Sequence, residues 1–162
     1  MIRPATAADA QALADLWNPW IRTSAVTFNS IEKTAADMAA MIADKATAGH
    51  GFWVALDAGT LLGFATYGQF RGGIGYAHAM EHTVVLAPEA RGKGIGRALM
   101  AVLEDHARSI GAHTILAGVS GENPEGRAFH AALGYSVVAV IPAVGRKFNR
   151  WMDIVLMQKF LS

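Results

Sequence analysis

The sequence contains no cysteine, which excludes disulfide bonds, thiolate metal ligands and cysteine nucleophiles. Charge is scarce: charged residues make up 17% of the chain and the net charge is only +1, so nothing indicates a nucleic-acid or anionic-membrane partner. No apolar run approaches the roughly eighteen residues of a membrane span, and the start, MIRPATAAD, lacks the apolar core of a signal peptide. These absences favour a cytoplasmic protein.

Apolar residues, by contrast, are plentiful. They make up 52% of 162 residues, which is enough for one real hydrophobic core and too little for two comfortable ones. No internal repeat or low-complexity linker divides the chain. The sequence therefore predicts a single domain over residues 1–162.

The most informative stretch is 81–111, EHTVVLAPEARGKGIGRALMAVLEDHARSIG. An apolar strand, HTVVL, leads through a glycine-rich loop into a helix that we expect over 94–109. One face of this helix is apolar because the following residues recur at steps of three and four: Ile95, Leu99, Val102, Leu103 and Ala107.

A strand, a glycine-rich loop and a helix in this order are a common device for holding a phosphate. The unpaired N–H groups of the first helical turn and the positive end of the helix dipole point into such a loop. Arg91 and Lys93 add two positive charges, and glycines let the backbone approach an anion closely. The stretch predicts an anionic ligand, most simply a diphosphate.

Competing interpretations of the loop differ in the residues they require. A nucleotide-hydrolase loop needs Ser or Thr after Gly-Lys, but Gly94 follows Lys93, and the spacing around Gly96 matches a dinucleotide fingerprint poorly. A merely flexible loop stays open as an alternative. The pattern Arg91-x-x-Gly94-x-Gly96 resembles the pyrophosphate loop of the GNAT superfamily of N-acetyltransferases, which holds the diphosphate of acetyl-CoA.

The remaining elements follow from caps, periodicity and turn residues. Thr6 with Asp9 and Thr34 with Asp37 predict two helix starts, and Pro19 is expected to disturb the end of the first helix. The expected strands are 2–4, 52–56, 61–67, 80–86, 113–119, 135–141 and 151–159, with helices at 35–47 and 125–133. This order predicts an α/β protein with a mixed central sheet flanked by about four helices, including a parallel strand pair around the central helix, as in the GNAT fold.

The resemblance extends over nearly the whole chain. The segments EHTVVLAPEARGKGIGRAL, GENPEGRAFHAALGY and IPAVGRKFNRWMDIVLMQ are similar to signatures of the phosphinothricin and methionine sulfoximine N-acetyltransferases. This likeness implies transfer of an acetyl group from acetyl-CoA to the α-amino group of a small amino acid or analogue, and a homodimer. Acetylation of a protein or another amine, and a non-catalytic acyl-CoA-binding module, are the alternatives.

The resemblance also implies roles for individual residues. Glu81 would be the general base, His130 a second catalytic residue, Arg71 the partner of the substrate carboxylate and Asn123 a contact of the pantetheine arm. By themselves these residues would be read as a solvated carboxylate, a structural histidine, a surface charge and a helix cap. The further implied contacts are Phe28, Lys147 and Trp151 for the substrate, and Val84, Val85, Leu86, Arg91, Gly92, Lys93, Gly94, Ile95, Gly96 and Arg97 for the cofactor.

Within the central strand, the likeness implies a bulge near Val84 to Leu86 that exposes backbone groups to the pantetheine arm. Two departures from the family pattern stand out. Val85 replaces a common tyrosine, which leaves the general acid unassigned, and Gly126 replaces a serine that could bind the cofactor.

A candidate metal motif occurs just before the central strand. His78, Glu81 and His82 spell H-x-x-E-H, but zinc chemistry requires both histidines on one helical face. In a strand they would stand about 13 Å apart, from a rise of about 3.3 Å per residue, which is too far for one ion. We expect no metal.

Overall fold

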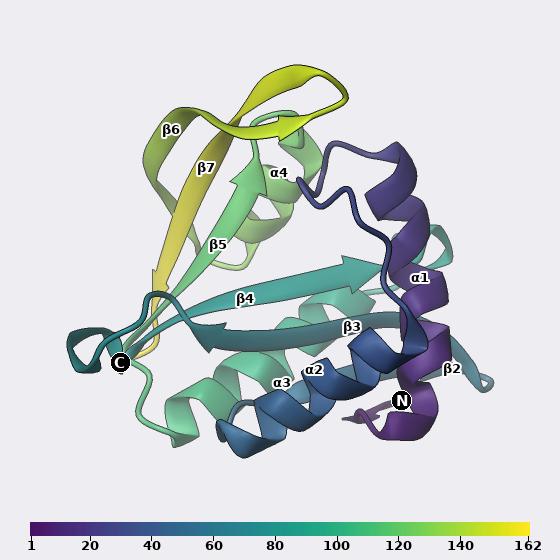
Figure 1. Ribbon diagram of the computed structural model, residues 1–162. Helices are drawn as coiled ribbons and strands as arrows, with labels where there is room; N and C mark the ends of the chain where they lie inside the picture. Colours follow the sequence, from purple (N-terminus) through teal and green to yellow (C-terminus); the bar gives the residue numbers. More distant parts are fainter.

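A computed structural model describes all 162 residues and contains a seven-stranded mixed sheet with four α-helices (Figure 1). The strand order is β1-β2-β3-β4-β5-β7-β6, and β4 and β5 are parallel, as predicted for the strands around the central helix. The elements are β1 (Ile2–Pro4), α1 (Ala10–Thr23), α2 (Ala35–Thr47), β2 (Phe52–Asp57), β3 (Thr60–Gln69), β4 (Ala79–Leu86), α3 (Ile95–Ser109), β5 (Thr114–Ser120), α4 (Pro124–Ala132), β6 (Ser136–Lys147) and β7 (Arg150–Phe160). None of the helices is long and apolar enough to cross a membrane.

Local sequence signals explain several of these boundaries. At the start of α2, the Asp37 N–H donates to Thr34 Oγ1 (3.1 Å) and the Thr34 N–H donates to Asp37 Oδ2 (2.8 Å), which is the predicted capping box. Between β2 and β3, Ala58 and Gly59 both have positive φ, as a tight two-residue hairpin turn requires. Helix α2 and the two strands on either side of this turn are confirmed where the sequence placed them.

The expectation that Pro19 disturbs the end of the first helix is wrong. Helix α1 continues through Pro19 to Thr23. Proline costs the helix one backbone hydrogen bond, but the buried side chains of Leu13, Trp17 and Ile21 anchor both sides of it in the core.

The end of the strand predicted at 135–141 is also wrong, because β6 continues to Lys147. Pro142 lies where the β6–β7 register shifts between Ile141 and Gly145, so its missing N–H interrupts no ladder bond there. The next backbone N–H, of Ala143, donates to the side-chain Oδ1 of Asp153 on β7 (2.9 Å) instead of to a backbone carbonyl of that strand.

Two hydrophobic cores lie on opposite faces of the sheet. Helix α3 covers one face, where Leu99, Met100 and Leu103 pack with side chains of the central strands. Helices α1 and α2 cover the other face, where Leu13 and Met38 pack with Phe52, Val54 and Phe64. Strand β4 is therefore held between two packed layers (Figure 1).

The sheet opens between β4 and β5. The two strands pair only at Ala79, Met80 and Glu81 of β4 and then diverge toward their carboxyl ends (Figure 1). The predicted bulge near Val84 to Leu86 is absent, because β4 keeps an unshifted register with β3 from Met80 to Leu86. The opening arises instead because β5 leaves β4 and stays paired with β7 as far as Ser120.

Candidate active site

A cleft of about 930 Å³ occupies the opening between β4 and β5. Its walls come from α1 and the loop after it, from β4, from the glycine-rich loop, from β5 and from α4. The residues that line it include Trp20, Thr27, Asn29, His82, Thr83, Val84, Val85, Leu86, Arg91, Gly92, Gly94, Ile95, Gly96, Gly118, Asn123, Gly126, Phe129 and His130.

The glycine-rich loop forms one end of the cleft. Gly94 has φ +73° and precedes α3, and the first helical bond runs from the Ala98 N–H to the Gly94 carbonyl (3.0 Å). The N–H groups of the first turn, at Ile95 to Arg97, therefore have no partner within the helix. A Cβ on Gly96 would lie 2.9 Å from Leu86 and Phe129, so only glycine lets this turn pack so closely.

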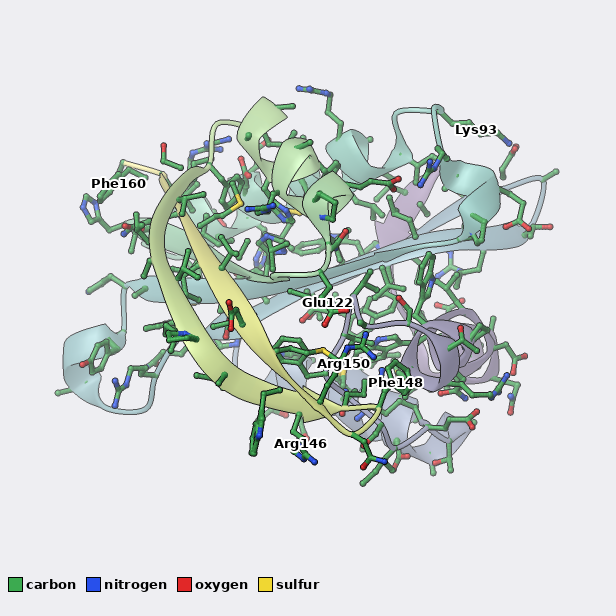
Figure 2. The ribbon with its side chains drawn as sticks, turned by 90° about the horizontal axis from the view of Figure 1, so that it is seen from above. Lys93, Glu122, Arg146, Phe148, Arg150 and Phe160 are labelled. Atoms are coloured by element: carbon green, nitrogen blue, oxygen red, sulfur yellow. The ribbon has the colours of Figure 1, made fainter.

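The basic residues of the loop are not oriented alike. The Arg91 guanidinium lies across the cleft entrance and hydrogen-bonds to the carboxylate of Glu125 on α4. Lys93 is exposed at the outer edge of the molecule (Figure 2), with its Nζ 3.8 Å from Asp57 Oδ2. Arg97 is exposed as well, and neither Lys93 nor Arg97 lines the cleft.

The exposed edge of β4 supplies backbone groups. The Ala87 N–H donates to the Leu62 carbonyl and the Phe70 N–H donates to the Ala79 carbonyl, which fixes the alternation of the antiparallel ladder. By this alternation Val84 and Leu86 direct their N–H and C=O groups away from β3, into the opening. Val85 directs its backbone toward Phe64 of β3 but lines the cleft, so its predicted contact with a cofactor stays a prediction.

Glu81 stands where β4 and β5 begin to separate. It pairs with Gly68 of β3 and Leu116 of β5, and a Cβ on Gly118 would lie 3.1 Å from Glu81 Oε2. Glu81 itself is not among the lining residues, but Gly118 lines the cleft and, having no side chain, leaves space between the cleft and the carboxylate. The residue is open to solvent, yet partial burial raises the pKa of the carboxyl above its ordinary value of 4.5.

His82 and His130 form a buried pair in the cleft wall. The His130 Nδ1–H donates to the Gly126 carbonyl (2.7 Å), and the His82 and His130 Nε2 atoms are 3.2 Å apart. Burial, and in second place the neighbouring His130, lowers the pKa of His82 to about 3, and burial also lowers the pKa of His130. With both rings neutral, the His82 Nε2–H donates to His130 Nε2, and His82 Nδ1 remains buried without a partner.

This arrangement bears on the predicted role of His130. Both of its ring nitrogens are engaged inside the protein, so neither presents a free lone pair to the cleft. The sequence singled out His82 only in the H-x-x-E-H segment and not as a partner of His130, because only the strand alternation and the position of α4 bring residues 48 apart in the chain together.

Two predicted substrate contacts lie outside the cleft. Arg71 is exposed in the loop after β3, and its guanidinium packs over the Tyr76 ring at 5.5 Å. Trp151 is 63% exposed on β7, with the Arg146 guanidinium over its ring at 4.6 Å. Neither residue lines the cleft in this structure.

The other two predicted substrate contacts hold the loop between α1 and α2. Lys147 is buried, and its Nζ donates to the carbonyls of Ser24 (2.7 Å) and Thr27 (2.8 Å), so the ammonium is used in a structural contact. Phe28 packs so closely on Gly145 that a Cβ there would lie 2.5 Å from its ring. The neighbouring residues Thr27 and Asn29, which the sequence did not single out, line the cleft instead.

Asn123 caps α4, since its Oδ1 accepts from the Gly126 N–H (2.9 Å). It also lines the cleft, so the predicted contact with a pantetheine arm stays a prediction. The histidines of the H-x-x-E-H segment bond to different partners: His78 Nδ1 lies 2.8 Å from the Gly111 carbonyl, whereas His82 pairs with His130.

Comparisons with known proteins agree with this geometry. The family model described as "Acetyltransferase (GNAT) family" matches residues 12–135. The L-amino acid N-acyltransferase MnaT of Escherichia coli is 36% identical over 157 residues, covering 97% of this chain and 91% of the relative. The L-methionine sulfoximine/L-methionine sulfone acetyltransferase of Salmonella typhimurium is 33% identical, covering 97% of this chain and 92% of the relative.

Solved structures are similarly close. The ribosomal-protein-alanine N-acetyltransferase of Brucella melitensis superposes with a TM-score of 0.95 at 34% identity, covering 99% of both chains. The putative acetyltransferase yncA of Salmonella typhimurium, solved with its cofactor acetyl-CoA, has a TM-score of 0.94 at 33% identity and covers 100% of this chain and 94% of that chain. The chain belongs to the acetyltransferase (GNAT) family, in the branch of the methionine sulfoximine and phosphinothricin acetyltransferases, and is an N-acetyltransferase.

Proposed function

We propose that this protein acetylates the α-amino group of a small amino acid or amino-acid analogue, with acetyl-CoA as the acetyl donor and Glu81 as general base. The observation that carries the proposal is a carboxylate of raised pKa beside Gly118, where β4 and β5 open into the cleft. The names of the relatives, which act on L-amino acids and on methionine sulfoximine or sulfone, support this substrate class.

The cleft fits acetyl-CoA, which would supply the acetyl group as a thioester. The free N–H groups at Ile95 to Arg97 suit a diphosphate, and Arg91 adds a guanidinium beside them. The Val84 C=O and the Leu86 N–H suit the amides of a pantetheine arm, because β5 has left them without a strand partner. Related structures that were solved with acetyl-CoA support this choice of acetyl donor.

Glu81 would prepare the amine. An amino acid arrives as an ammonium and must lose a proton before its nitrogen can attack, and a carboxylate with a raised pKa accepts that proton, directly or through a water. A Val84 N–H directed into the opening would polarise the carbonyl under attack. His130 would contribute by shaping the cleft wall with His82, since both of its ring nitrogens are engaged.

The proposal includes a homodimer and a cytoplasmic location. The exposed apolar side chains of Val137, Val138 and Val140 on the edge strand β6 support an interface with a second copy. Exposed Arg71, outside the cleft of one chain, stays a candidate for the substrate carboxylate.

A second candidate activity is acetylation of a protein amino terminus. Its support is the similarity to the ribosomal-protein-alanine N-acetyltransferase of Brucella melitensis. In a peptide, the carboxylate beside the α-amine is replaced by an amide. The two activities therefore differ in whether the substrate must carry a negative charge next to its amine.

The test measures release of coenzyme A thiol from acetyl-CoA with amino acids, phosphinothricin, methionine sulfoximine, methionine sulfone and alanine-terminated peptides. Glu81→Gln should bind acetyl-CoA as the wild type does and lower kcat by about a hundredfold or more, the usual range for a general base. Wild-type kcat/KM should fall as the pH falls through the raised pKa of Glu81, because the carboxylate is then protonated.

Glu122→Gln provides the matched control, because it removes a carboxylate that pairs with Arg150 outside the cleft (Figure 2). Full turnover by Glu81→Gln would contradict the base assignment. Turnover with peptides alone would replace the amino-acid substrate by a protein.

A further inference from the structure

Trp20 of α1 lines the cleft and bonds to the end of β4. Its indole Nε1–H donates to the Leu86 carbonyl at 3.1 Å, which links residues 66 apart in the chain. The side chain is half-buried and lines the cleft, so it meets both the end of β4 and the space beside it.

The carbonyl that Trp20 binds belongs to the open edge of the strand. The ladder bond between the Ala87 N–H and the Leu62 carbonyl places Leu86 at an alternate position, whose backbone groups point away from β3. Strand β5 cannot satisfy this carbonyl, because its pairing with β4 ends at Glu81. Without the indole, the Leu86 carbonyl would be an unpaired acceptor facing the opening.

Near Leu86 this edge leaves the N–H and C=O of Val84 and the N–H of Leu86 without a strand partner. A pantetheine arm carries two amides and can add to such an edge as a short strand would. An extra free acceptor at Leu86 would offer these amides a second register, shifted along β4. The indole removes that acceptor and leaves one register.

We propose that Trp20 is a positioning residue that sets where along β4 the pantetheine arm pairs, by occupying the Leu86 carbonyl and walling the cleft beside it. This inference rests on the proposed function, because it needs acetyl-CoA in the cleft. Trp20 does not touch the phosphate-binding N–H groups, so its effect is confined to the arm. An effect limited to the arm distinguishes a positioning role from general support of the fold.

Trp20→Phe tests the inference, because phenylalanine retains most of the ring volume and lacks the N–H. Calorimetry would compare acetyl-CoA with adenosine 3′,5′-bisphosphate, which carries the nucleotide end of coenzyme A without the arm. We expect the affinity for acetyl-CoA to fall by about tenfold, as for the loss of one buried hydrogen bond, and the affinity for the bisphosphate to stay within about twofold of wild type. An unchanged affinity for acetyl-CoA, or an equal loss for both ligands, would overturn the inference.

A measurement on the wild-type protein keeps the test independent of how the variant folds. The indole N–H signal of Trp20 in a nitrogen–proton correlation spectrum should shift when acetyl-CoA is added and stay in place with the bisphosphate. A signal that responds equally to both ligands would contradict the inference. If the wild type binds no acetyl-CoA at all, the proposed function and this inference both fail. If the wild type binds acetyl-CoA normally, the Trp20→Phe result tests the role of Trp20 alone.

Discussion

His82 and His130 illustrate how much a single residue can depend on its neighbours. Their rings share hydrogen bonds in a wall packed with Tyr135 and Phe129 and remain neutral because burial disfavours the charged form. The nearby charge of Glu104 favours protonation of His130, but Glu104 is engaged with the Tyr135 hydroxyl and Lys159 Nζ. Below neutral pH the two histidines bind protons in the unfolded chain but stay neutral in the folded protein.

This difference in proton binding between the two states predicts that the stability of the fold depends on pH. His82 has a pKa of 6.5 when unfolded and about 3 when folded, so the unfolded state binds more protons between these values and stability rises with pH there. Between pH 7 and pH 5 this histidine should remove about 2 kcal/mol from the free energy of unfolding. Denaturant titrations at both pH values should show the loss in the wild type and a smaller loss in His82→Phe.

His113→Phe is the matched control, because it removes an exposed histidine that bonds to Ser162. It should keep the wild-type difference between the two pH values. Equal pH dependence in His82→Phe and the wild type would show that His82 is not held neutral in the folded state.

At the scale of elements, the cleft is framed by pieces that approach it from different parts of the chain. The glycine-rich loop and α4 face each other across its entrance, and the pair Arg91–Glu125 joins them. Both side chains are exposed, so the pair contributes little to stability. The pair matters more for ligand binding, because the Arg91 guanidinium, which would bind a diphosphate, is already paired with the Glu125 carboxylate.

We predict that Glu125→Gln binds acetyl-CoA a few-fold more tightly than the wild type in calorimetry, because the carboxylate no longer competes with the diphosphate for Arg91. The melting temperature should be unchanged. Glu89→Gln is the control: it removes an exposed carboxylate from the same loop region without breaking the Arg91 contact. The same gain in both variants would indicate a general charge effect rather than competition by Glu125.

At the scale of the whole molecule, the sheet ends in a long apolar edge. Strand β6 is the outermost strand, and Val137, Val138, Val140 and Val144 are exposed along it. An exposed apolar edge strand of this length pairs with other chains unless something covers it. We propose that a second copy of the chain covers the exposed edge of β6.

Val140→Asp should therefore shift the protein from dimer to monomer in size-exclusion chromatography with light scattering, because it places a charge in the buried interface. Ile31→Asp is the control, since Ile31 is 79% exposed and lies in the loop before α2 rather than on β6. A wild-type monomer, or a Val140→Asp dimer, would contradict the placement of the interface on β6.

Features that depend on neighbours in sequence could be predicted from the sequence alone. The capping box of Thr34 and Asp37, the apolar face of α3 and the glycine pattern after β4 all act within a few residues, so residue type and spacing suffice. Strand β6 passed beyond its predicted end because a bulge accommodates Pro142, and such a bulge depends on the partner strand.

The site required the tertiary structure for the same reason. Sequence determined that this chain has a loop suited to a diphosphate and a glutamate at the start of its central strand. Only the fold decided that His82 meets His130, that Trp20 binds the Leu86 carbonyl and that Lys147 holds the loop after α1. These contacts join residues 48, 66 and 123 positions apart, and strand order and register, which no local pattern encodes, bring them together.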